Sequence, residues 1–163
     1  MDQLIQPIVF NTEVETLLKS YDLPTSDLPV SSGVLLFGHA SGGALIGVIG
    51  LEVYGEYALL RSLAVADSAH GMGLGAALVA YAERYAAEHG GKTVYLLTTT
   101  AEAYFERRGY SRIRRSEAPE KIASTDQFSV LCPSSSTFMS KSCARESDVP
   151  DGRAPGGRSC QGN

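Results

Sequence analysis

The feature that most constrains the fold is a glycine-rich turn between an apolar strand and an amphipathic helix. Residues 59–65 form an apolar, strand-like run, and the polar loop 66–69 follows it. His70-Gly71-Met72-Gly73-Leu74-Gly75 then opens a segment with apolar residues at helical spacing. Glycines let a ligand approach backbone N–H groups, and the first turn of a helix has unpaired donors and the positive end of the peptide dipole. The pattern therefore predicts a phosphate-binding turn in a chain that holds a phosphorylated small molecule.

Length and composition limit the architecture and the partners. The chain has 163 residues, of which 44% are hydrophobic, and this suffices for one domain with a buried core. The formal net charge of -4 gives no general attraction to nucleic acid or to an anionic membrane, so we expect neither as a partner. There is no run of 18 apolar residues and no basic N-terminal leader, so we expect a cytoplasmic protein without membrane span or signal peptide.

The cysteines and histidines predict no metal centre. The number of cysteines is odd, and Cys132, Cys143 and Cys160 do not form the Cys-x-x-Cys spacing typical of metal or redox sites. The histidines lie far apart and have no cysteine or aspartate companions at ligand spacing. We expect reduced thiols and no bound metal.

The hydrophobic pattern predicts an α/β fold with a mixed, mostly antiparallel sheet flanked by helices. A capping-box pattern at Thr12–Glu15 indicates the start of a first helix. The expected strands are 33–39, 44–54 and 57–65, joined by tight turns, then 93–97 and two closing strands at 112–114 and 127–131. Further helices are expected from residue 74 to Gly90-Gly91 and at 102–108.

The end of the chain has a different composition. Residues 144–163 contain four glycines, two prolines and almost no large apolar side chain, so burial cannot offset the entropy lost on ordering. We therefore expect a folded domain over residues 1–143 and a disordered tail over residues 144–163.

The glycine turn has two other interpretations. Gly71-x-Gly73-x-x-Ala76 also fits the dinucleotide fingerprint, but the loop 66–70 is too long for it, and the next strand ends at Thr98 without a carboxylate for the ribose. A Walker A sequence is absent. The remaining alternative is that the glycines only permit close packing of the helix.

In the order and spacing of two motifs, the chain resembles the GNAT (Gcn5-related) N-acetyltransferase superfamily. The first motif is Leu63-Ala64-Val65 at a strand end, followed by Gly73 and Gly75, with His70 where glutamine or arginine is usual. The second motif is matched by Thr98, Ala101, Phe105, Glu106, Gly109 and Tyr110, and together the motifs cover residues 30–112. A narrower resemblance, to the arsenic-resistance N-acetyltransferase branch, rests on residues 60–65, 96–101 and 125–133.

The resemblance implies a splayed sheet and acetyl-CoA as co-substrate. The pyrophosphate would lie against the backbone N–H groups of the glycine turn, and the pantetheine arm would pair with the strand that ends at Val65. A backbone N–H near Leu63 or Val65 would stabilise the developing oxyanion. The residues implied to bind the cofactor are Leu63, Ala64, Val65, His70, Gly71, Met72, Gly73, Leu74, Gly75, Thr98, Phe105 and Arg108.

The attacking amine needs a group that accepts its proton. Glu52 interrupts an apolar strand and Glu56 lies in the turn that follows, so both are candidates, unless they are an exposed strand residue and a solvated turn residue. Arg61 is the only charge in its strand and is a candidate to bind the carboxylate of an amino-acid-like acceptor, or else points outward. Thr99 is a second candidate substrate contact.

One departure from the motif leaves two functions open. The tyrosine that normally protonates the leaving thiolate is replaced by Phe105, and the adjacent Tyr104 points about 100° away around the helix. Tyr104, water or a threonine hydroxyl would then supply the proton. We expect an acetyl-CoA-dependent N-acetyltransferase for a small amino-acid-like amine, in arsenic or xenobiotic resistance, with a homodimer left open. The alternative is a non-catalytic acetyl-CoA-binding regulator or sensor.

Overall fold

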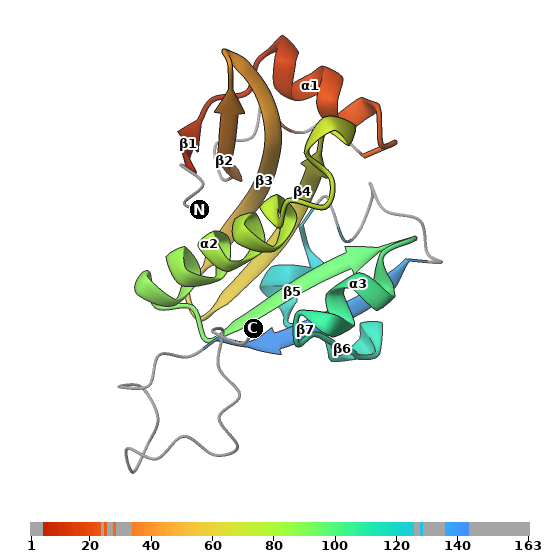
Figure 1. Ribbon diagram of the computed structural model, residues 1–163. Coiled ribbons are helices and arrows are strands. Elements are labelled where there is room, and N and C mark those ends of the chain that lie inside the picture. The colour runs from red at the N-terminus through yellow and green to blue at the C-terminus, as the bar shows by residue number, and fades with distance from the viewer. Residues whose placement is uncertain are drawn as a thin grey trace. The chain divides into compact units, whose positions relative to one another are not determined.

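The computed structural model describes residues 5–23, 25, 28, 34–125, 128 and 136–143. Among these residues, one mostly antiparallel sheet has seven strands in the order β1-β2-β3-β4-β5-β7-β6 (Figure 1). The strands are β1 (Gln6–Ile8), β2 (Val34–Ser41), β3 (Ala44–Tyr54), β4 (Tyr57–Val65), β5 (Thr93–Thr98), β6 (Ser111–Arg112) and β7 (Thr137–Ser142). The helices are α1 (Thr12–Lys19), α2 (Leu74–Glu88), α3 (Glu102–Arg107) and α4 (Glu120–Ala123), with 3-10 turns η1 (Asp67–Ala69) and η2 (Arg115–Glu117). The predicted α/β class is confirmed.

The chain packs as two compact units, each with its own apolar core. The first unit comprises residues 1–52 and 60–82, and the second comprises residues 53–59 and 83–163. Strands β3 and β4 and helix α2 therefore contribute to both units.

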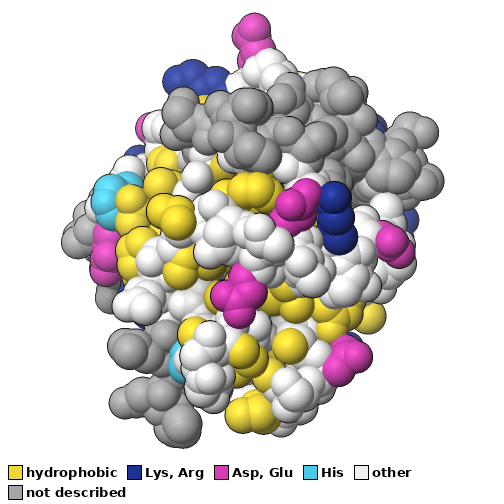
Figure 2. Space-filling model, turned by 90° about the horizontal axis from the view of Figure 1, so that it is seen from above, with side chains coloured by type: hydrophobic (Ala, Val, Ile, Leu, Met, Phe, Trp, Pro, Cys, Tyr) yellow, Lys and Arg dark blue, Asp and Glu magenta, His cyan; other side chains and the backbone are white. Residues whose placement is uncertain are grey.

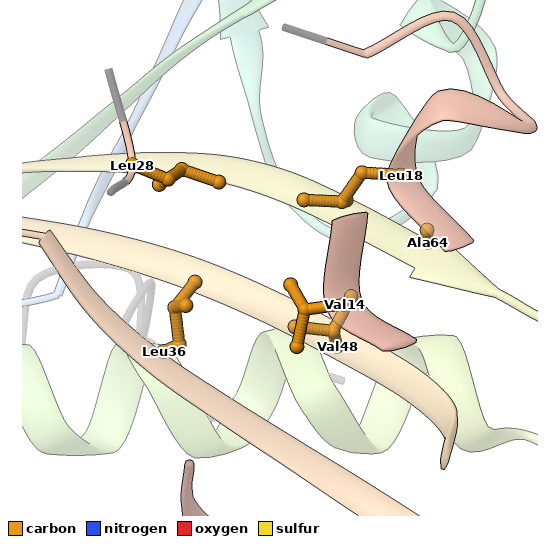
Figure 3. Packing of buried hydrophobic residues seen from close by; sticks show 6 residues of the cluster. All are labelled: Val14, Leu18, Leu28, Leu36, Val48 and Ala64. Carbon is orange, nitrogen blue, oxygen red and sulfur yellow. The ribbon is translucent and has the colours of Figure 1, made fainter. Parts of the chain in front are cut away.

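The first unit is built on the antiparallel strands β1, β2 and β3. Their register pairs Pro7 with Phe37 and Phe37 with Ile49. Helix α1 begins after Asn11, whose side chain accepts a hydrogen bond from the Val14 N–H at 2.9 Å, so the N-cap is Asn11 and not the predicted Thr12. A cluster of buried side chains from α1, the strands and the intervening segment forms the core: Val14, Leu18, Leu28, Leu36, Val48 and Ala64 (Figure 3).

A glycine on β3 sets where helix α2 begins against the sheet. A Cβ atom at Gly47 would lie 2.7 Å from Leu74 Cδ2 and 3.0 Å from Leu78 Cδ1. Both leucines are in the first turns of α2 and are almost fully buried. The absence of a side chain at Gly47 lets Leu74 and Leu78 pack directly against β3. Because Leu74 follows Gly73 directly, this packing also positions the end of the glycine turn on the sheet.

The second unit is built on β5, β6 and β7. Strand β5 pairs with β7 from Thr93 opposite Ser142 to Thr98 opposite Thr137. The rings of Tyr95 and Phe138 stack with centroids 5.5 Å apart, in a core that also includes Leu59 and Ile122. Helix α2 ends in this unit as predicted, where Gly90 has φ +94° and the Gly91 N–H donates to the Ala86 carbonyl.

The closing strands differ from the prediction. The expected strand 112–114 is reduced to Ser111–Arg112, and β7 and β1 were not predicted. Of the expected strand 127–131, only Phe128 is among the described residues, and it is not in a strand. The predicted tail, residues 144–163, lies outside the described residues.

Candidate functional site

The glycine turn between η1 and α2 has an exposed, left-handed backbone. Gly71 has φ +83° and Gly73 has φ +79°, which side chains rarely adopt. A Cβ atom added at either glycine would meet no described heavy atom within 4 Å. These two glycines are therefore required by the backbone conformation and not by close helix packing, which excludes the packing alternative at these positions. Successive N–H groups around left-handed residues form a concave site for an anion.

Helix α2 adds its own unpaired donors to this turn. The first helical hydrogen bond runs from the Ala77 N–H to the Gly73 carbonyl at 3.0 Å, so the Leu74, Gly75 and Ala76 N–H groups have no acceptor within the helix, whereas the Met72 N–H donates to the Ala69 carbonyl at 3.4 Å. The helix dipole places partial positive charge at the same end. Met72 is 60% exposed, which shows that the turn faces solvent. Turn and helix end together have the donors that a phosphate group requires.

The loop before the turn is held by side-chain contacts. The Tyr21 hydroxyl lies 2.6 Å from the Val65 carbonyl oxygen and 2.7 Å from Asp67 Oδ1. The hydrogen bond to Asp67 raises the pKa of Tyr21, which keeps the hydroxyl protonated at neutral pH. His70 Nε2 is 2.7 Å from the same carbonyl oxygen, and because a carbonyl only accepts, this nitrogen must carry a proton. Nε2 of His70, expected to serve the phosphate, is thus already engaged with the Val65 carbonyl.

Strand β4 has an irregular backbone conformation at Ser62. This residue has φ +59°, a left-handed conformation in the middle of a strand, as at a β-bulge. On β3, a Cβ atom at Gly50 would lie 3.2 Å from Arg61 Cγ and 3.3 Å from Ser62 Cβ, so a glycine accommodates the irregularity. Leu63, Ala64 and Val65 follow this point directly, and the glycine turn follows them.

Glu52 and Arg61 form a buried ion pair beside the bulge. Arg61 Nη1 is 2.9 Å from Glu52 Oε2, and the exposed fractions of the two side chains are 0% and 7%. Arg61 Nε also donates to Ser62 Oγ at 3.1 Å. Neither residue therefore has the exposed position that was the simpler alternative for it. Each instead gives the other a partner of opposite charge.

The other predicted site residues belong to the second unit. Glu56 is exposed, and its backbone carbonyl accepts hydrogen bonds from the Lys92 and Thr93 N–H groups. Thr98 Oγ1 accepts a hydrogen bond from the Ala101 N–H at 3.0 Å, just before α3, and Thr99 is exposed.

The remaining three predicted residues are Tyr104 and Phe105 in helix α3 and Arg108 at its C-cap. Phe105 is buried, and its ring lies edge-on to that of Tyr110. Arg108 lies over the Tyr104 ring at 4.8 Å, and Arg108 Nε is buried without a hydrogen-bond partner.

A buried polar cluster in the second unit was not predicted. The Lys141 ammonium donates to Glu83 at 3.1 and 3.2 Å and to the Arg108 carbonyl at 2.8 Å, and the Tyr110 hydroxyl donates to Glu83 Oε2 at 2.9 Å. All three side chains are at most 8% exposed. Burial raises the pKa of Glu83, while Lys141 and Tyr110 lower it. No local sequence signal indicates this cluster, because Glu83 and Lys141 are 58 positions apart.

The described ranges contain no group of three or more histidine, cysteine or acidic side chains placed to hold a metal ion. Within those ranges, no helix is both long and apolar enough to cross a membrane. On the face shown in Figure 2, the acidic side chains are scattered among uncharged ones and form no single patch. Cys143 is buried, and desolvation raises the pKa of its thiol to about 12, while Cys132 and Cys160 lie outside the described residues.

Comparisons with known proteins bear on this arrangement. A model of the acetyltransferase (GNAT) family matches residues 8–110. An uncharacterized N-acetyltransferase of Chlorobaculum tepidum is 36% identical over 81 residues, which are 49% of this chain and 52% of that protein. This chain thus spans about half the length of that curated relative.

Two solved structures have a similar backbone. N-acetylglutamate synthase of Neisseria gonorrhoeae, complexed with coenzyme A and N-acetyl-glutamate, has a TM-score of 0.70 at 17% identity, over 89% of this chain and 36% of that one. An acetyltransferase of the GNAT family from Staphylococcus aureus has a TM-score of 0.66 at 17% identity, over 85% of this chain and 99% of that one. At this identity the likeness shows the fold.

Proposed function

The chain belongs to the acetyltransferase (GNAT) family, and on that premise we propose that it transfers an acetyl group from acetyl-CoA to the primary amine of a small, amino-acid-like molecule. The observation that carries the proposal is the glycine turn. Gly71 and Gly73 hold left-handed conformations next to open space, and they lead into the unpaired N–H groups of α2. A pyrophosphate is the anion that such a turn fits in this family.

In this proposal, separate residues bind acetyl-CoA and stabilise the oxyanion. The glycine turn holds the pyrophosphate, and the family resemblance implies Thr98 and Arg108 as further cofactor contacts. The unpartnered Nε of Arg108 supports its role, because a phosphate oxygen would supply the missing acceptor. Backbone N–H groups after the Ser62 irregularity stabilise the oxyanion that develops on the thioester carbonyl.

The acceptor class is the finer part of the proposal. Its support is the narrower resemblance to arsenic-resistance N-acetyltransferases, together with a fold like that of an N-acetylglutamate synthase. On the same resemblance we propose a role in detoxification of an organoarsenical amino acid. Arg61 gives this acceptor little support, because its guanidinium is fully buried and already bound to Glu52.

Calorimetric titration with acetyl-CoA tests the cofactor, with NAD and ATP as controls. We expect selective binding in the micromolar range, about -8 kcal/mol. Thiol release in the presence of a panel of amino-acid-like amines, one an organoarsenical, then tests transfer. Absence of acetyl-CoA binding overturns the proposal. Binding without turnover on any amine favours the non-catalytic sensor, for which Phe105 in place of a proton-donating tyrosine is the supporting observation.

The role of Glu52 can be decided by the variant Glu52→Gln. A glutamine keeps an oxygen for the Arg61 guanidinium, so the local geometry persists while the carboxylate is lost. Because the ion pair accounts for the burial of Glu52, we expect kcat to stay within about threefold of wild type, against the loss of about 100-fold or more typical of a missing general base. Steady-state kinetics over a range of pH provide the measurement.

The control for the Glu52→Gln variant is the same substitution at Glu56, the other candidate base. Glu56→Gln changes an exposed carboxylate in the turn between β3 and β4. A large loss of kcat in Glu52→Gln alone would show that Glu52 is the base and would contradict the expectation that its carboxylate serves only the ion pair with Arg61.

A further inference from the structure

A tyrosine outside both sequence motifs contacts the segment that leads into the glycine turn. The Tyr21 oxygen lies 2.6 Å from the Val65 carbonyl oxygen, 2.7 Å from Asp67 Oδ1 and 3.2 Å from His70 Nε2. These three atoms are spread along the segment from the end of β4 to the residue before Gly71. The Tyr21 side chain, which follows α1 in the sequence, thus contacts this segment at its start, middle and end.

The Tyr21 hydroxyl is one of two hydrogen-bond donors available to Val65 and Asp67. The Val65 carbonyl and the Asp67 carboxylate only accept hydrogen bonds, and the phenol has one proton to give. His70 Nε2 carries the other proton and donates it to the Val65 carbonyl at 2.7 Å. Tyr21 and His70 together therefore supply the donors for Val65 and Asp67. Without the Tyr21 hydroxyl, one of these acceptors loses its donor, and the segment keeps only the contact from His70.

Tyr21 is itself fixed to the core of the first unit. Its N–H donates to the Leu18 carbonyl at 3.1 Å, and the Leu23 N–H donates to the same carbonyl. Leu18 is fully buried, and the chain turns after Tyr21 because Asp22 has φ +60°. The Tyr21 ring packs against the same core cluster. Its hydroxyl therefore connects the exposed loop to the buried core of the unit.

We propose that Tyr21 is a positioning residue for acetyl-CoA, whose hydroxyl fixes the course of Val65–His70 so that the glycine turn presents its N–H groups to the pyrophosphate. This inference rests on the proposed function, because it assumes that acetyl-CoA is the ligand of the turn. Since Tyr21 acts through the turn, its effect should depend on the pyrophosphate and not on the pantetheine arm or the 3′-phosphate.

The variant Tyr21→Phe tests this with three ligands. CoA and dephospho-CoA both contain the pyrophosphate, whereas pantetheine lacks it. We expect the Kd of Tyr21→Phe for CoA and for dephospho-CoA to rise by the same factor, about fivefold to tenfold, as for one lost hydrogen bond. The Kd for pantetheine, measured by competition, should change less than about twofold. Asp67→Ala, at an exposed residue, should weaken the two pyrophosphate ligands in the same selective manner but by a smaller factor.

The control is Tyr57→Phe, which removes the same atom from the aromatic cluster of the second unit and should leave all three Kd values unchanged. If the wild-type chain does not bind CoA, the proposed function fails and not the role of Tyr21. If wild type binds CoA and Tyr21→Phe binds it equally well, the inference is overturned. Equal weakening of all three ligands also overturns it, because a general loss of structure would then be the cause.

Discussion

Replacing Gly73 with valine is expected to raise the Kd for acetyl-CoA by about 100-fold. This change in Kd corresponds to the loss of one or two charge-assisted hydrogen bonds. Gly73 has φ +79°, where a β-branched side chain is strained, so the backbone of the turn must move. The new side chain would also fill the open space beside the turn, where no described atom lies within 4 Å of the Cβ position. Both effects remove N–H groups from the phosphate. Calorimetric titration of the variant measures the change.

The matched control is Gly55→Val. Gly55 lies in the turn before β4, has φ +66°, and likewise has open space around its Cβ position. The two substitutions should therefore lower the free energy of unfolding by similar amounts, about 1–2 kcal/mol. Only Gly73→Val should affect acetyl-CoA binding. Equal binding by both variants would contradict the assignment of the turn as the phosphate site.

Much of the first unit follows from local sequence signals. The paired glycines at Gly42-Gly43 and the Gly55-Glu56 turn divide the apolar residues into strands whose ends the structure reproduces closely. The second unit was harder to predict. Strand β7 has two adjacent buried residues, Phe138 and Met139, and a buried lysine, so it lacks the alternation by which a strand is recognised. Its position depends on pairing with β5, which is distant in sequence.

The candidate site shows the same division. The glycine turn was predictable because left-handed backbone is specified by glycine itself. Glu52 and Arg61 stand out in the sequence as charges within apolar strands, but their pairing across two strands depends on the register. Tyr21 carries no sequence signal for its contact with Val65, because the two residues are 44 positions apart and meet only through the fold.

Replacing Lys141 with methionine is expected to lower the free energy of unfolding by about 3–5 kcal/mol at neutral pH, because it leaves the Glu83 carboxylate buried without its ion-pair partner. Lys141 contacts both Glu83 oxygens, and Glu83 is 2% exposed. Lys19→Met is the control, since the Lys19–Glu15 pair is exposed and should contribute little. Chemical denaturation of both variants measures the difference.

The loss in Lys141→Met should depend on pH in a defined direction. Burial raises the pKa of Glu83 and Lys141 lowers it, so removing Lys141 moves the folded-state pKa further above the unfolded value. Between the two values the folded state binds more protons, so stability is retained below the unfolded pKa and lost as pH rises through the folded pKa. We therefore expect Lys141→Met to be markedly less destabilising at about pH 5 than at about pH 8. Glu83→Gln added to Lys141→Met removes the titrating group and should abolish this dependence. A deficit that stays constant with pH in Lys141→Met would show that lost packing, and not the buried charge, is its cause.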